Sequence, residues 1–214
     1  MTDIRVEVRQ YDHKDLPDVD LAEVWRYSGC RKIPDDQVMT GLMNDTVSRF
    51  KSEARPRVCF AVTDQVPFTT DSKGLARVLA GSSKVITFAA TVGIEYDRLI
   101  RRYQRIEPTR ALILQALGAE RVEALCDLFC SGFEGRTSRY SPGYGDLPLE
   151  VQKDVFAVLS PESRIGISLN DSLLMTPSKS VTALFGIRDG SESIDGHDCS
   201  QCGLLSCEFR RETK

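Results

Sequence analysis

One ten-residue segment, 139–148, combines the residue types that could hold a small ligand. Its sequence is Arg-Tyr-Ser-Pro-Gly-Tyr-Gly-Asp-Leu-Pro. The two prolines fix φ and remove backbone donors, while the two glycines permit backbone angles that a Cβ would forbid. The segment is therefore predicted to be a shaped loop, and its Arg139 and Tyr144 suit a ligand with a carboxylate and a flat ring. A surface turn with a solvated arginine is the alternative interpretation of this pattern taken alone.

Two carboxylates upstream form a second candidate feature. Glu123 and Asp127 are four residues apart in a predicted helix, so they share one face of it. Without a cation nearby in the same helix, the two charges repel each other. Either solvent screens this repulsion at an ordinary surface, or the pair belongs to a functional site.

A cysteine-rich tail is the third candidate feature. His197, Cys199, Cys202 and Cys207 have ligand-like spacing and could bind zinc. An iron–sulfur cluster is the rival interpretation, because cysteine thiolates are its usual ligands. Free thiols in a solvated tail are the third possibility, and the spacing does not decide among them.

These candidate residues must be positioned by an irregular series of strands and helices. Strands are expected at 57–63, 84–90, 165–169 and 181–187, and an alternating pattern predicts another near residues 4–8. A long helical region is expected over 108–133, with Gly118 as a candidate interruption. No glycine-rich phosphate turn joins a strand to a helix, which favours an α+β fold over a doubly wound nucleotide fold. Other helices are predicted at 21–27, from Pro34 to Phe50, at 75–79, 95–106 and 149–159.

Composition excludes several functions. The 214 residues are 41% hydrophobic and 28% charged, as in a globular protein. The net charge of −3 argues against a nucleic-acid partner, and no run of apolar residues is long enough to span a membrane. The first residues contain no apolar signal core, so a cytoplasmic location is expected, in which the seven cysteines would be thiols or metal ligands.

Three blocks of the chain together resemble one family. They are 123–127 (Glu-Ala-Leu-Cys-Asp), the loop 139–148, and 165–181, which ends in Pro-Ser-Lys-Ser-Val. Their order and spacing resemble the activation domain of cobalamin-dependent methionine synthase, in its stand-alone form. The resemblance implies a single α+β domain over residues 1–190, with a central, mainly antiparallel sheet and flanking helices. The cysteine-rich tail would then occupy 191–214.

The resemblance also implies a function. In this family the domain binds S-adenosylmethionine and supports reductive methylation of a cobalamin that has fallen to the inactive cob(II) state. The chain would thus be the methyl-transfer component for a separate cobalamin-dependent methionine synthase that lacks its own activation domain. A flavodoxin-like or other donor would supply the electron. Two alternatives stay open: an electron-transfer activator of another corrinoid methyltransferase, working through a metal or Fe–S tail, and a scaffold that only holds the cobalamin protein.

Specific residues follow from the resemblance. Arg139 matches the arginine that pairs with the ligand carboxylate, and Glu123 matches a glutamate that can accept from the ligand ammonium or ribose hydroxyls. In the loop, Gly143 would let the backbone reach the adenine edge, while Tyr144 would contact the ligand or its pocket wall. Asp127 is the weaker candidate, expected to support these residues and not to contact the ligand itself. Pro142 is included in the binding loop, and no catalytic residue is expected, because the methyl group moves between two cofactors.

The chain also departs from the family pattern. The large enzyme has aromatic residues just after its Ser-Val pair, whereas here only Phe185 could supply a ring at that place. An N-terminal aspartate contact of the family has no match.

Overall fold

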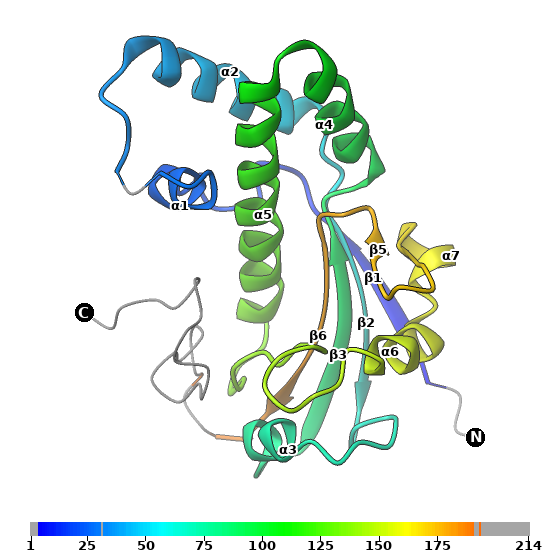
Figure 1. Cartoon of the computed structure of the whole chain (residues 1–214). Coiled ribbons are helices and arrows are strands. Elements are labelled where there is room, and N and C mark those ends of the chain that lie inside the picture. Colours follow the sequence, from blue (N-terminus) through cyan, green and yellow to red (C-terminus); the bar gives the residue numbers. More distant parts are fainter. Residues whose placement is uncertain (1–3, 31, 191–192, 194–214) are drawn as a thin grey trace.

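The computed structural model describes residues 4–30, 32–190 and 193. Four strands form one sheet in the order β1-β2-β3-β6, and every neighbouring pair is antiparallel. The predicted α+β class with an antiparallel sheet and flanking helices is therefore confirmed (Figure 1). The strands are β1 (Val6–Gln10), β2 (Arg57–Thr63), β3 (Lys84–Thr91), β4 (Ser168–Leu169), β5 (Met175–Thr176) and β6 (Ser180–Ile187). The helices are α1 (Leu21–Tyr27), α2 (Gln37–Glu53), α3 (Lys73–Leu79), α4 (Ile94–Ile106), α5 (Pro108–Ser131), α6 (Val151–Leu159) and α7 (Pro161–Ile165).

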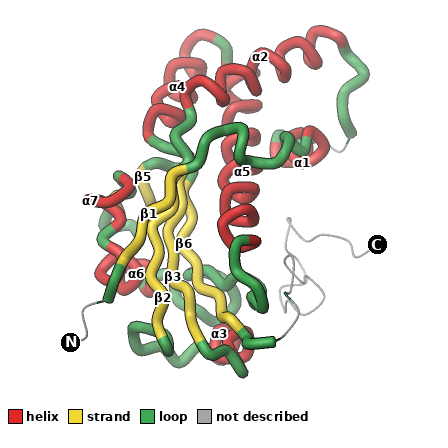
Figure 2. Tube along the Cα trace, turned by 180° about the vertical axis from the view of Figure 1, so that it is seen from behind, coloured by secondary structure: helices red, strands yellow, loops and turns green. Residues whose placement is uncertain are grey.

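The central strand β3 is buried on both faces, as its uninterrupted run of β-branched and aromatic residues predicts. Successive side chains point to opposite faces of a strand. Phe88 therefore packs in the core beneath α5, while Ala89 packs in the core beneath α6 and α7. Figure 2 shows the sheet lying between these two groups of helices.

The long helix α5 joins the sheet to a second, helical core. Its C-terminal half covers the sheet, and its N-terminal half packs with α1, α2 and α4. The helix is continuous at Gly118, where an interruption was a candidate. A Cβ at this position would lie 2.4 Å from Cε1 of Tyr96, so the glycine admits the α4 ring, whose hydroxyl donates to the Leu114 carbonyl at 2.7 Å. Close packing between helices, and not a helix end, explains this glycine.

Several predicted bounds differ from the structure by one or two residues, and two predicted elements differ by more. The helix expected to open at Pro34 begins at Gln37, because the Asp36 carboxylate caps it by accepting from the amides of Val38 and Met39. The strand expected over 165–169 is only β4, since α7 ends at Ile165 and Gly166 adopts φ 74°. β4 does not join the main sheet; it pairs with β5 in a separate hairpin. No described helix is long and apolar enough to cross a membrane.

Candidate ligand-binding site

The predicted loop begins by pairing with the outer edge of β6. The Tyr140 amide donates to the Leu184 carbonyl at 2.8 Å and its carbonyl accepts from the Leu184 amide at 2.9 Å. The Thr137 amide donates to the Gly186 carbonyl at 2.9 Å, and the Gly186 amide donates to the Thr137 hydroxyl at 2.8 Å. If the pairing continued, Pro142 would lie opposite Thr182. Proline has no N–H to donate, so it cannot extend the ladder. Because the direction of the backbone groups alternates along a strand, the N–H and C=O of Thr182 point toward the same edge as those of Leu184. Pro142 therefore leaves these groups of Thr182 beside the loop.

The other end of the loop is anchored on the N-terminus of α3. The Asp146 carboxylate accepts from the Ser72 hydroxyl, from the Lys73 amide at 2.8 Å and from the Gly74 amide at 3.1 Å. The Tyr140 hydroxyl also donates to it, at 3.3 Å. The Ser72 hydroxyl, followed by these backbone amides, lowers the pKa of Asp146 to about 2. We call this group the Asp146 anchor (Ser72, Lys73, Gly74, Tyr140 and Asp146).

Between these attachments, Arg139 turns toward α5 and meets the two carboxylates noted in the sequence. Its Nη2 lies 3.1 Å from Oε2 of Glu123 and 2.8 Å from Oδ1 of Asp127. The Arg139 side chain is only 10% exposed, against 38% for Glu123 and 68% for Asp127. Burial alone would lower the pKa of Arg139, but its acidic neighbours, Cys126 first and then the two carboxylates, raise it overall. The guanidinium is therefore a buried, permanent cation.

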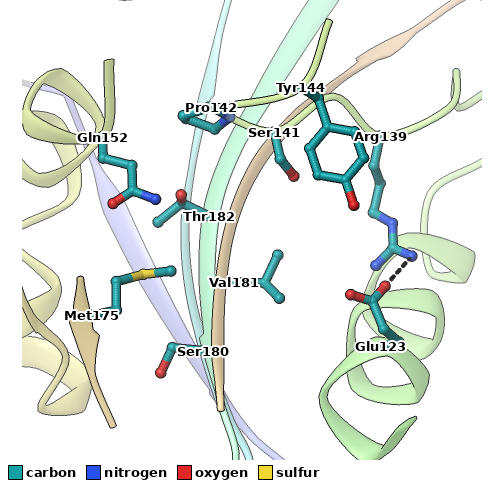
Figure 3. A pocket seen from close by; sticks show the side chains of 10 residues that line it. All are labelled: Glu123, Arg139, Ser141, Pro142, Tyr144, Gln152, Met175, Ser180, Val181 and Thr182. Carbon is teal, nitrogen blue, oxygen red and sulfur yellow. Dashed lines mark hydrogen bonds and ion pairs between the residues drawn. The ribbon is translucent and has the colours of Figure 1, made fainter. Parts of the chain in front are cut away.

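The other terminal nitrogen of this guanidinium, Nη1, is buried and has no hydrogen-bond partner among the described residues. Buried polar groups are normally paired, so an orphaned guanidinium nitrogen needs an explanation. It lies at a pocket of about 220 Å³ (Figure 3). The pocket is lined by Glu123, Arg139, Ser141, Pro142, Tyr144, Gln152, Met175, Ser180, Val181 and Thr182.

Two more orphaned polar atoms line the same pocket. Oε1 of Gln152, on α6, and Oγ1 of Thr182, on β6, are buried without partners among the described residues. Figure 3 shows these two side chains on the wall across from Arg139 and Glu123. A cavity with an unpaired cationic donor on one side and unpaired acceptors on the other is suited to a ligand with complementary polar groups.

The structure brings together most of the residues singled out in the sequence. Glu123, Arg139, Pro142 and Tyr144 all line the pocket, although they come from two separate segments. Asp127 does not line it but pairs with Arg139. The remaining predicted residue, Gly143, adopts φ 87° against the Leu149 side chain and is not among the lining residues.

Other pocket residues were not given roles by the sequence. Gln152 lies in a helix that its apolar stripe predicts, and such a stripe says nothing about the polar residues beside it. Thr182 follows the Ser-Val pair of the third block, which carried the resemblance without a residue assignment. Phe185 does not supply a ring to the pocket, because it is fully buried against Phe88 and Phe129 in the core beneath α5.

The tail candidates His197, Cys199, Cys202 and Cys207 lie outside the described residues, so zinc, a cluster or free thiols stay predictions. Within the described ranges, no group of three or more His, Cys, Asp or Glu side chains could hold a metal ion. Cys126 and Cys130 are buried, as expected for small core residues. Burial raises the pKa of Cys130 to about 12, which keeps this thiol protonated.

The fold and the pocket together define an α+β domain with a polar pocket at the edge of its sheet. Residues 127–195, which include the loop and β6, match the family model of the vitamin B12-dependent methionine synthase activation domain. A crystal structure of the MetH reactivation domain bound to AdoHcy has the same fold. It has a TM-score of 0.62 and 18% identity, over 89% of this chain and 81% of that one. The resemblance to the methionine synthase activation domain is confirmed, while no curated protein sequence gives a significant match.

Proposed function

We propose that this chain binds S-adenosylmethionine in the pocket and supports reductive methylation of cob(II)alamin held by a separate cobalamin-dependent methionine synthase. The observation that carries the proposal is the buried Arg139 guanidinium, whose Nη1 has no partner among the described residues and lies at the pocket. A carboxylate from the amino-acid end of the ligand would satisfy this donor. The match to the activation-domain family and the AdoHcy in the solved relative support the choice of ligand.

The surrounding residues fit the rest of such a ligand. Glu123 lies beside Arg139, where it can accept from the ligand ammonium or a ribose hydroxyl. Across the pocket, Gln152 and Thr182 offer buried oxygens to donors on the ribose or purine. The Tyr144 ring, which is 60% exposed at the rim, provides a flat apolar surface, and Gly143 keeps the backbone beside it free of a Cβ. These groups would bind and orient the ligand without taking part in bond breaking.

The size of the pocket is consistent with methyl transfer to a second protein. About 220 Å³ is below the roughly 300–1,000 Å³ of most small-molecule pockets. A nucleoside ligand would therefore remain partly uncovered. S-adenosylmethionine supplies a methyl group on a sulfonium, and a corrinoid on a partner could reach it only from an open side. The role of the protein would be to hold the donor in a reactive orientation.

Isothermal titration calorimetry with S-adenosylmethionine on the wild type and on Arg139→Ala tests the binding step. Losing a charge-assisted contact costs about 1.5–3 kcal/mol, so the affinity should fall at least about tenfold. Arg139→Lys should also weaken binding, because a single ammonium cannot contact both carboxylates and the ligand with the planar geometry of a guanidinium. Arg101→Ala is the control, since this arginine is exposed on α4.

Equal affinity in the wild type and Arg139→Ala would contradict the proposal, as would a wild type that does not bind at all. Circular dichroism on each variant separates loss of the contact from loss of the fold. The second step is tested with a methionine synthase that lacks an activation domain, trapped as cob(II)alamin, together with a chemical reductant. Methylcobalamin should appear only when this protein and S-adenosylmethionine are both present.

The role of the tail is tested separately. Anaerobic purification followed by optical and EPR spectra distinguishes an iron–sulfur cluster from zinc, which is silent in both. A cluster would favour the alternative of an electron-transfer activator for another corrinoid methyltransferase.

A further inference from the structure

The cluster of ionised side chains around Arg139, at one side of the pocket, carries more negative than positive charge. Nη2 of one guanidinium is shared between two carboxylates, Glu123 and Asp127, at 3.1 and 2.8 Å. The other lining residues, apart from Glu123 and Arg139, have uncharged side chains. The cluster of Glu123, Asp127 and Arg139 therefore has a formal charge of −1.

One carboxylate would be enough to neutralise the buried arginine. The second one adds a like charge one helical turn away on α5, an arrangement that is unfavourable in isolation. The cluster thus retains an excess negative charge beside a pocket. Solvent screens part of this excess, because the Asp127 side chain is 68% exposed and that of Glu123 is 38% exposed, while Arg139 between them is only 10% exposed.

The methyl donor and its demethylated product differ by one charge. S-adenosylmethionine has a carboxylate, an ammonium and a sulfonium, and so a net charge of +1. Without the methyl group the sulfur is a neutral thioether, and S-adenosylhomocysteine has no net charge. When the carboxylate bonds Nη1 of Arg139, the donor neutralises the cluster, whereas the product leaves it at −1.

We infer that Glu123 and Asp127 make this site selective for the sulfonium form of the ligand over the thioether form. The inference rests on the proposed function and goes beyond it by assigning a product-release role to the acidic pair. Both ligands have the same ammonium and carboxylate, so contacts to the amino-acid end cancel in the ratio of their affinities. The ratio of the two affinities therefore reports only the difference between the methylated sulfonium and the neutral thioether sulfur. Loss of the sulfonium charge on methyl transfer would weaken binding and help the product to leave.

The test is calorimetry with three ligands at low and high salt. The wild type should bind S-adenosylmethionine roughly five- to tenfold more tightly than S-adenosylhomocysteine at low salt, as one unit charge several ångströms away at an intermediate dielectric predicts. High salt should reduce this ratio. Sinefungin, in which a protonated amine replaces the methylated sulfonium, should bind like the methyl donor, because it keeps the charge.

Neutral variants identify the source of the selectivity. Asp127→Asn and Glu123→Gln each leave one carboxylate for one guanidinium, so each should bring the ratio of affinities toward one, whatever they do to the individual affinities. Glu53→Gln, an exposed carboxylate near the end of α2, should leave the ratio unchanged. Asp127→Asn is the cleaner variant, because Asp127 does not line the pocket and is already 68% exposed.

Several outcomes would overturn the inference. Equal binding of methyl donor and product by the wild type excludes charge selection, and so does an unchanged ratio in both variants. If sinefungin binds as weakly as the product, the site recognises the methyl group by contact and not by charge. Absence of binding by all three ligands would overturn the proposed function as well, so the two failures are distinguishable.

Discussion

At the scale of single residues, the site depends on charges held in fixed positions by hydrogen bonds. Arg139 is a buried cation that pairs with two carboxylates, and one of its nitrogens is left for a ligand. Asp146 plays the opposite role, as an anion that backbone amides hold at the start of α3. The first residue is expected to touch the ligand, while the second positions the loop that carries Tyr144.

The Asp146 anchor predicts a specific dependence on acid. Its folded-state pKa, about 2, is below the value of about 3.9 for an unfolded aspartate. The stabilisation should therefore be fully present above pH 4 and should be lost as the pH falls toward 2. In thermal melts, wild type should be more stable than Asp146→Asn at pH 5, and the difference should shrink steadily between pH 4 and 2. A difference that is constant over this range would contradict the assignment.

At the scale of elements, α3 and the loop are matched by close approach as well as by hydrogen bonds. A Cβ at Gly74 would lie 2.2 Å from the Tyr140 hydroxyl and 2.7 Å from Oδ1 of Asp146. A Cβ at Gly145 would also lie 2.2 Å from the same hydroxyl. Glycine is unfavourable in a helix, so its presence at residue 74 in a helix of only seven residues indicates that contact with the loop outweighs helix propensity.

Two helical glycines should consequently respond to alanine with opposite signs. Gly74→Ala should destabilise the protein by about 1–2 kcal/mol, because the new methyl group displaces the Tyr140 ring from the Asp146 anchor. Gly41→Ala in α2 meets nothing within 4 Å and should stabilise it by about 0.4–1 kcal/mol. Urea unfolding of both variants checks the signs. Stabilisation of both would show that α3 does not need the close approach.

At the scale of the whole molecule, α5 holds two cores and the N-terminal segment together. Buried Glu120 and Arg121 form an ion pair with each other. Arg121 also donates to the Pro17 carbonyl at 2.6 Å and to the Asp18 carbonyl at 3.1 Å, while Glu120 accepts from the Asp20 amide. The segment between β1 and α1 is therefore fastened to the same helix that presents Glu123 and Asp127.

Removing one partner of this ion pair should be costly. Glu120→Ala leaves the Arg121 guanidinium buried without a carboxylate, which typically costs about 3–5 kcal/mol. Glu53→Ala, at an exposed position with no ion pair among the described residues, should change the free energy of unfolding by less than about 0.5 kcal/mol. Equilibrium denaturation of the two variants measures both values. A loss below about 1 kcal/mol for Glu120→Ala would show that water solvates the remaining charge.

Much of the local structure was predictable because it depends on neighbours in the chain. The expected spans of α1 and β2 were confirmed, since α1 has an apolar stripe at helical spacing that stops at Gly29, while β2 is a run rich in β-branched and aromatic residues. The strand expected at 165–169 failed because α7 ends at Ile165 and Gly166 takes up a left-handed conformation. Short apolar runs are ambiguous between helix and strand, and here packing against the sheet decided the outcome.

The residues of 139–148 are enough to predict a shaped loop, because proline fixes φ and glycine permits positive φ wherever they occur. The sequence also placed Glu123 and Asp127 on one helical face. The position of Arg139 between them follows from the folded chain alone, as do the oxygens of Gln152 and Thr182 on the opposite wall, which have no partner in the described part of the chain. These relations join three separate elements, so they depend on strand register and helix packing, which no local pattern specifies.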